Sequence, residues 1–189
     1  MKINELFLSL QGEGHFTGTA ALFLRFAGCN LSCPFCDTLH TPFTEYTEAQ
    51  LIGAVLELSA GVRHIVITGG EPSLQLTDSF VDLLHQHGFF VQVETNGTHE
   101  LPAKVDWSTC SPKANGTVVL TRINEIKLLF DGSEPTLHQG LQADEYRLQP
   151  LDTGNAERNN EITEKTINYI LTHPQWKLSL QTHKILSIQ

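Results

Sequence analysis

The chain has 189 residues, of which 40% are hydrophobic, and this length suits one domain over residues 1–189 with a sizeable core. The formal net charge is −9, and the acidic residues are spread along the chain. This composition argues against a nucleic-acid partner, because broad contact with phosphates needs basic surface. No apolar run is long enough to span a bilayer, so a membrane is not an expected partner either.

Residues 1–11 alternate polar and apolar side chains and lack the apolar centre of a signal peptide. Four cysteines, three of them clustered, are too few for a disulfide framework. Both observations favour a reducing, cytoplasmic location. Because the acidic composition argues against a nucleic-acid partner, we expect a small molecule as the substrate.

Strands and helices are predicted to alternate along the chain. Thr47 and Gln50 form a capping box at the start of a helix, whose apolar stripe ends at Gly61. Further helices are expected near residues 80–84 and over 156–172, and strands over 20–26, 64–68, 89–94, 105–108, 125–130, 145–149 and 176–180. This alternation predicts an α/β fold with a parallel sheet and right-handed crossovers.

Residues able to bind ligands follow nearly every predicted strand. They are the cysteine loop, Gly-Gly-Glu-Pro at 69–72, Glu-Thr-Asn-Gly at 94–97, Ser-Pro-Lys at 111–113, Gln-Pro at 149–150 and Gln-Thr-His-Lys at 181–184. In parallel α/β folds, ligands bind beyond the carboxyl ends of the strands. We therefore expect these motifs to meet on one rim of the fold.

Three of the cysteines form a Cys-x3-Cys-x2-Cys run at Cys29, Cys33 and Cys36. A [4Fe–4S] cluster is normally held by four thiolates, so three thiolates would leave one iron open to a small molecule. A structural zinc site with His40 as the fourth ligand and a disulfide remain alternatives at this point. Cys110 lies outside the run and is expected to be a buried small side chain.

The cysteine run, with an aromatic residue before its last cysteine and Gly-Gly-Glu-Pro downstream, resembles the radical S-adenosylmethionine (SAM) superfamily. A narrower set of motifs resembles the 7-carboxy-7-deazaguanine synthase family. This set adds Leu-Gln-Gly-Glu-Gly at 10–14, Arg-Phe-Ala-Gly-Cys-Asn at 25–30, Phe-Cys-Asp-Thr at 35–38 and the motifs at 94–97, 111–113, 149–150 and 181–184. The resemblance covers almost the whole chain.

The resemblance implies an open, partial β/α barrel of the radical SAM type with mostly parallel strands. It implies a lyase that contracts the ring of 6-carboxy-5,6,7,8-tetrahydropterin to 7-carboxy-7-deazaguanine, with loss of ammonia, in queuosine biosynthesis. The implied cofactors are a [4Fe–4S] cluster, SAM and Mg²⁺, and the implied partners are a reductant such as flavodoxin and a second copy in a homodimer. An activating enzyme for a partner protein and a non-catalytic zinc or iron–sulfur module are the alternatives.

The resemblance also implies the roles of site residues. Cys29, Cys33 and Cys36 would bind three irons, and the Thr38 hydroxyl would bind Mg²⁺. The SAM-binding positions would be Phe35, Cys36, Asp37, Gly70, Ser111, Pro112, Lys113, Gln149, Pro150, Leu151 and Asp152. The substrate-binding positions would be Leu10, Gln11, Gly12, Glu13, Arg25, Thr68, His183 and Gln189. Arg25 suits a substrate carboxylate, because a planar guanidinium pairs with it through two hydrogen bonds.

Two further features bear on the expected pocket. Lys127 lies in the middle of a predicted strand, and its side chain either enters the pocket or extends outward to solvent. Ile185, Leu186 and Ile188 make the last residues apolar, so we expect this segment to be docked and to help enclose the site.

Overall fold

The computed structural model describes residues 1–34, 36, 38, 41–135 and 140–189, so the expectations for Phe35, Asp37 and His40 lie outside the described residues. Its elements in chain order are β1 (Lys2–Leu10), β2 (Ala20–Phe26), β3 (Thr44–Glu45), α1 (Glu48–Leu58), β4 (His64–Gly69), the 3-10 helix η1 (Pro72–Leu74), α2 (Asp78–Gln86), β5 (Phe90–Thr95), β6 (Trp107–Cys110), β7 (Arg122–Phe130), β8 (Gln142–Pro150), α3 (Ala156–Thr172), β9 (Trp176–Leu178) and α4 (Thr182–Leu186).

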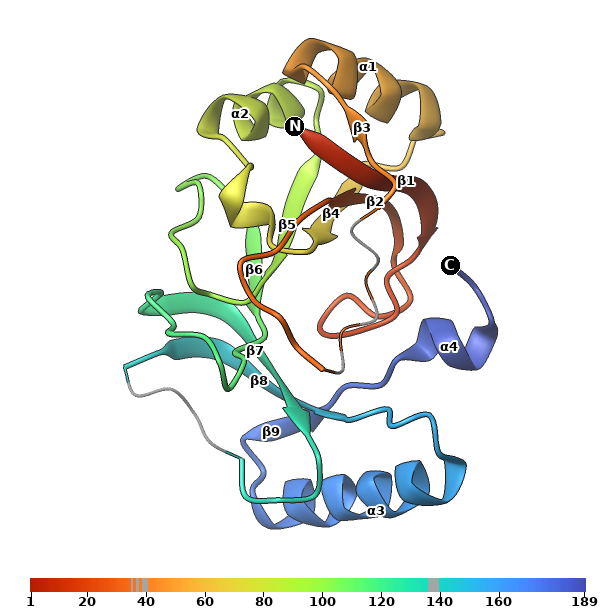
Figure 1. Ribbon diagram of the computed structural model, residues 1–189, viewed down its shortest axis with the longest axis vertical. Coiled ribbons are helices and arrows are strands. Elements are labelled where there is room, and N and C mark those ends of the chain that lie inside the picture. The colour runs from red at the N-terminus through yellow and green to blue at the C-terminus, as the bar shows by residue number, and fades with distance from the viewer. Residues whose placement is uncertain (35, 37, 39–40, 136–139) are drawn as a thin grey trace.

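The strands form one sheet in the order β3-β1-β2-β4-β5-β6-β7-β8-β9. Every neighbouring pair from β2 to β9 is parallel, whereas β1 pairs antiparallel with both β2 and β3. The sheet is curved, and its edge strands β3 and β9 do not pair with each other, so the barrel is open (Figure 1). The predicted α/β fold with mostly parallel strands is therefore confirmed.

Local sequence signals place the helix starts correctly. The Thr47 hydroxyl accepts the backbone N–H of Gln50 at 3.2 Å, and the Gln50 side chain accepts the backbone N–H of Thr47 at 2.9 Å. At α3 the Asn155 side chain accepts the backbone N–H of Arg158 at 3.0 Å. The observed span of α3, Ala156–Thr172, equals the predicted one. These caps satisfy amide groups that a helix leaves without intrahelical partners.

The sequence prediction misplaced or omitted several short elements. The strand expected over 105–108 is observed as Trp107–Cys110. Asp106 lies just before this strand, and its carboxylate accepts the backbone N–H of Val91 at 2.7 Å. β1, β3, η1 and α4 were not predicted. β1 does show the alternating pattern of a strand with one buried face.

Two hydrophobic clusters cover the outer face of the sheet. The first joins β1, β2, β4 and β5 to helices α1 and α2, and the second joins β6 to β9 to helix α3. Figure 1 shows α1 and α2 at one end of the molecule and α3 at the other. Cys110 is fully buried in the second cluster, as expected. None of the helices in the described ranges has the length and hydrophobicity needed to cross a bilayer.

Polar side chains from the central strands are also buried. Gln92, Glu125, Lys127 and Gln149, from strands β5, β7 and β8, are each at most 7% exposed. Buried polar groups cost free energy unless they are paired. Lys127 and Gln149 line a cavity on the opposite side of these strands from the hydrophobic clusters, together with the carboxylates of Glu13 and Glu94 that pair with Lys127.

Candidate functional site

A cavity of about 870 Å³ lies at the carboxyl ends of the parallel strands. Eighteen of the predicted site residues line it: Leu10, Gln11, Gly12, Glu13, Arg25, Cys29, Cys33, Cys36, Thr38, Thr68, Gly70, Ser111, Lys113, Gln149, Leu151, Asp152, His183 and Gln189. Pro112 and Pro150 are neighbours of these residues in the chain and do not line the cavity. The motifs therefore meet on one rim, as the sequence predicted.

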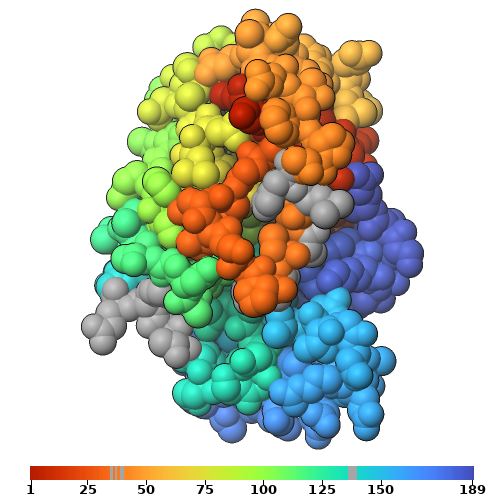
Figure 2. Space-filling model, in the orientation of Figure 1, coloured from red at the N-terminus to blue at the C-terminus, as the bar shows by residue number. Residues whose placement is uncertain are grey.

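The segment that carries the three cysteines is exposed on the face of the molecule shown in Figure 2, where it is orange. All three thiols line the cavity and are free of disulfide bonds. The backbone N–H of Leu31 donates to the Cys29 thiol at 3.4 Å, and burial raises the pKa of that thiol. The disulfide alternative is wrong.

The three thiols fit an iron–sulfur cluster better than zinc. A zinc ion needs its ligands to converge on a single point. Within the described part of the chain, no group of three or more His, Cys, Asp or Glu side chains does so. Thiolates that bind three different irons of one cluster have no need to share a point. The donor set at Cys29, Cys33 and Cys36 therefore matches three cluster ligands.

Gly69 and Gly70 allow the backbone after β4 to press against the start of the cysteine loop. Gly70 donates its N–H to the Phe26 carbonyl at 3.0 Å, and a Cβ atom at Gly70 would lie only 1.9 Å from the Gly28 carbonyl oxygen. Gly69 has φ of +140°, and a Cβ there would lie 2.2 Å from the Phe26 carbonyl oxygen. Only glycine fits either position.

Glu71, the acidic residue of the Gly-Gly-Glu-Pro motif, is buried and accepts hydrogen bonds from two segments of the chain. One carboxylate oxygen accepts the Ser73 N–H at 3.0 Å, the Ser73 hydroxyl at 2.6 Å and the Thr95 hydroxyl at 2.7 Å. The other accepts the Asn96 N–H at 2.7 Å. The bonds to Thr95 and Asn96 connect the loop after β4 to the end of β5, and the bonds to Ser73 hold the start of η1. The sequence singled out this motif but did not reveal the role of its glutamate.

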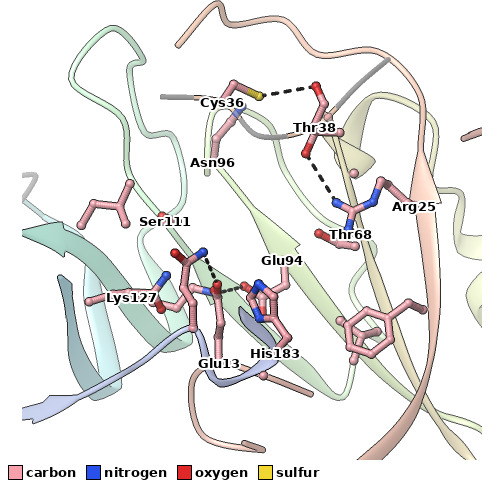
Figure 3. Close-up of a pocket in the computed structure, with 18 of the residues that line it drawn as sticks. Glu13, Arg25, Cys36, Thr38, Thr68, Glu94, Asn96, Ser111, Lys127 and His183 are labelled. Atoms are coloured by element: carbon pink, nitrogen blue, oxygen red, sulfur yellow. Dashed lines mark hydrogen bonds and ion pairs between the residues drawn. The ribbon is translucent and has the colours of Figure 1, made fainter. Parts of the chain in front are cut away.

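Arg25 and Thr38 lie together on one side of the cavity. The Arg25 Nε donates to Glu5 at 2.7 Å, and its Nη1 donates to the Thr38 hydroxyl at 3.4 Å. Thr68 lines the same side (Figure 3). A half-buried guanidinium, with donors left over after its bond to Glu5, suits an anionic group of a ligand.

Lys127 enters the cavity and joins two carboxylates on the other side. Its Nζ lies 2.6 Å from Glu13 and 2.8 Å from Glu94. Burial raises the pKa of Glu13, but the Lys127 ammonium, the hydrogen bond from Gln181 and the charge of His183 together outweigh burial and lower it to about 2. Burial likewise opposes the charge of Lys127, and the two carboxylates raise its pKa. Figure 3 shows Arg25 and the Glu13–Lys127 pair on different sides of the site.

The cofactor-binding motifs predicted after β6 and β8 lie in the same cavity. The Lys113 ammonium donates to the Ser111 hydroxyl at 2.7 Å. Burial, followed by repulsion from Lys127, lowers the pKa of Lys113. Gln149 accepts the Ser179 hydroxyl at 2.8 Å through its side-chain oxygen.

The C-terminal segment is docked by polar contacts instead of the expected apolar ones. The Gln181 side chain donates to Glu13 at 2.9 Å, and the Lys184 ammonium lies 2.6 Å from Asp152. Ser9 donates to the backbone oxygen of Gln189 at 2.7 Å. The expectation that apolar burial docks this segment was wrong, because the apolar side chains on and just after the short helix α4 point to solvent: Ile185, Leu186 and Ile188 are 69%, 57% and 37% exposed.

Sequence reasoning missed Glu94, Asn96 and Gln181 as individual site residues. Glu94 lies at the end of the apolar strand β5 and opens the Glu-Thr-Asn-Gly motif, which was a usable signal. Asn96 places its side-chain amide 4.0 Å from the Cys29 thiol. Gln181 opens the Gln-Thr-His-Lys motif, but its contact with Glu13 joins residues 168 positions apart and no local pattern reveals it.

Comparison with known proteins identifies the family. Residues 24–107 match the model of the radical SAM superfamily. Over its full length the chain is 45% identical to 7-carboxy-7-deazaguanine synthase of Bacteroides thetaiotaomicron, covering 98% of that protein. The chain belongs to the 7-carboxy-7-deazaguanine synthase family.

Other members support the same assignment. The synthase of Bradyrhizobium diazoefficiens is 41% identical, and the alignment covers 99% of this chain and 98% of that protein. The crystal structure of QueE from Escherichia coli has a TM-score of 0.77 and 30% identity, and the match covers 95% of this chain and 92% of that chain. This match over nearly all of the chain agrees with the open α/β architecture described above. Membership of the radical SAM superfamily implies a [4Fe–4S] cluster and SAM as cofactors.

Proposed function

We propose that this cavity is the site at which a 7-carboxy-7-deazaguanine synthase of queuosine biosynthesis converts 6-carboxy-5,6,7,8-tetrahydropterin to 7-carboxy-7-deazaguanine with loss of ammonia. One observation carries the proposal. The same cavity is lined by the three free thiols, by a guanidinium on one side and by a carboxylate pair on the other. The substrate matches this arrangement, because it carries a carboxylate at one end, which suits the guanidinium, and N–H donors at the other end, which suit the carboxylates.

Cys29, Cys33 and Cys36 would hold the cluster, with no further protein ligand. Gly70, Ser111, Lys113, Gln149 and the adjoining chain would hold SAM, together with Phe35 and Asp37 from the cysteine loop. When bound, the two cofactors supply the one-electron chemistry that removes a hydrogen atom from a substrate carbon. The residues around them orient the substrate and keep water away from the reacting centre.

Arg25 would bind the substrate carboxylate, and Glu13 would accept N–H groups from the pyrimidine ring. Thr68, His183 and the segment at 10–12 would complete the contacts. The Thr38 hydroxyl would hold Mg²⁺ near the carboxylate, since it lies 3.4 Å from the Arg25 guanidinium. A single neutral oxygen from the protein suits Mg²⁺, which keeps water and substrate oxygens as its other ligands. The metal would orient the substrate and polarise its oxygens.

We also propose a cytoplasmic homodimer of single-domain chains that receives electrons from a protein such as flavodoxin. Leu8 and Leu10 on β1 and Ile185 and Leu186 on α4 expose apolar side chains to solvent. Such a surface supports self-association. Light scattering of the purified protein should give twice the mass of the chain, and a monomeric mass would contradict the proposal.

The test of the reaction uses anaerobically purified protein with its cluster reduced. This protein is incubated with the carboxytetrahydropterin, SAM and Mg²⁺, and the products are separated by chromatography and weighed by mass spectrometry. We expect 7-carboxy-7-deazaguanine and ammonia in equal amounts. Protein carrying Cys29→Ala serves as the control without a complete cluster site. Cleavage of SAM with no change in the pterin would contradict the proposed substrate.

A further inference from the structure

Lys127 forms ion pairs with two carboxylates, Glu13 and Glu94, which in turn accept hydrogen bonds from two glutamine side chains. The side chains of Lys127, Glu13 and Glu94 are 8%, 17% and 15% exposed, and they come from β7, the loop after β1 and β5. Each carboxylate uses one oxygen for the ammonium. The other oxygen of Glu13 accepts from Gln181 at 2.9 Å, and that of Glu94 accepts from Gln92 at 2.9 Å. Both carboxylates are therefore held in fixed orientations.

The Lys127 ammonium offsets the repulsion between the two buried carboxylates. Two buried carboxylates that share one site repel each other, so one of them takes up a proton unless a cation lies between them. Lys127 is in direct contact with both carboxylates. Among the described residues, the other titratable groups that act on the network are Lys113 after β6, His183 on α4, Glu125 on β7 and Cys110 on β6. Of these, Glu125 adds further negative charge beside Glu94.

We propose that Lys127 is a positioning residue, which keeps Glu13 and Glu94 jointly ionised and aims them at the cyclic guanidine edge of the pterin. This assignment rests on the proposed function. That edge carries N–H donors from the ring and from the exocyclic amine, and two ionised carboxylates are its natural acceptors. Arg25 binds the carboxylate of the same substrate on the other side of the cavity, so the two ends fix its orientation.

The alternative is that Lys127 serves only to pack and stabilise the interior. The two roles predict different responses to pH. If Lys127 only packs, its loss weakens substrate binding equally at every pH. If it holds the carboxylates ionised, its loss introduces a new ionisation, and binding becomes weak at low pH and recovers as the pH rises.

The test measures binding of 6-carboxy-5,6,7,8-tetrahydropterin by calorimetry from pH 6 to pH 8.5. The protein carries SAM and an oxidised cluster, so that no turnover occurs. Wild-type protein should show a nearly constant Kd. We expect Lys127→Met to weaken binding roughly tenfold or more at pH 6, with recovery toward pH 8.5. Lys127→Arg retains the charge and should keep the constant profile. Binding of SAM should remain unchanged in both variants.

A second variant keeps the test decisive if an unpaired buried charge prevents Lys127→Met from folding. The double variant Lys127→Met with Glu13→Gln leaves one carboxylate, so its binding should be weak but independent of pH. A wild-type Kd profile parallel to that of Lys127→Met, or a strong pH dependence in the double variant, would overturn the role of Lys127. Wild-type protein that fails to bind the pterin at any pH would instead overturn the proposed function.

Discussion

The carboxylate of Glu71 gives the sharpest test of how the site is held together. Glu71 is fully buried and accepts four hydrogen bonds, from Ser73, Thr95 and Asn96. The substitution Glu71→Gln keeps the shape but replaces one oxygen with an amide. In its best orientation the remaining oxygen keeps the bonds to Ser73 and Thr95. The new NH2 group then faces the backbone N–H of Asn96, so two donors oppose each other.

The cost can be estimated from these contacts. A hydrogen bond to a charged group contributes about 1.5–3 kcal/mol, and leaving a buried donor unsatisfied costs a similar amount. Removing a buried charge recovers part of this cost, because the amide is easier to bury. We expect Glu71→Gln to lower the free energy of unfolding by about 3 kcal/mol. For a chain of this size the loss corresponds to a fall in Tm of about 6–12 °C.

Urea and thermal unfolding, followed by circular dichroism under anaerobic conditions, measure the effect. Glu164→Gln, at an exposed position on α3, is the matched control and should change stability by less than about 0.5 kcal/mol. The iron content of Glu71→Gln should also fall, because Asn96 lies between Glu71 and the Cys29 thiol. A variant as stable as Glu164→Gln would refute the argument that Glu71 ties the two loops together.

Three further predictions test other parts of the site. Gly70→Ala should reduce both stability and iron content, because its Cβ would lie 1.9 Å from the Gly28 carbonyl oxygen. Gly53→Ala on α1 is the control, since a Cβ there meets nothing within 4 Å and should change neither property. Equal iron content in the two variants would contradict this prediction. Because the folded-state pKa of Glu13 is lowered from 4.5 to about 2, its contribution to stability is complete above pH 4.5 and is lost as the pH falls toward 2. The difference in unfolding free energy between wild type and Glu13→Gln should therefore shrink between pH 6 and pH 3, and a constant difference would show that the ion pair does not depend on this ionisation. Thr38→Ala should weaken the dependence of turnover on Mg²⁺ and leave the iron content intact, with Thr38→Ser as the control that keeps the hydroxyl; an unchanged Mg²⁺ titration would contradict the metal assignment.

The sequence by itself determined the features that depend on neighbouring residues. The helix α3 is bounded by the cap at Asn155 and by Pro174 just beyond its end, so its span was predicted correctly. The spacing of the cysteine run indicated a cluster or metal site, and the glycine pair downstream strengthened its resemblance to the radical SAM superfamily. The location of the site also followed, since parallel strands bring their carboxyl ends to one edge.

Only the tertiary structure decided which distant side chains meet. Lys127 is 114 residues from Glu13 and 33 residues from Glu94, and its direction depends on the order of β7 and β5 in the sheet. The three partners of Glu71 likewise come from two separate segments, the 3-10 helix η1 and the end of β5. The apolar end of the chain misled the prediction, because polar bonds from Gln181 and Lys184 dock that segment and leave its apolar side chains exposed. Local patterns predict elements and their ends. Pairings between remote charges depend on strand order and burial, which no short segment of sequence contains.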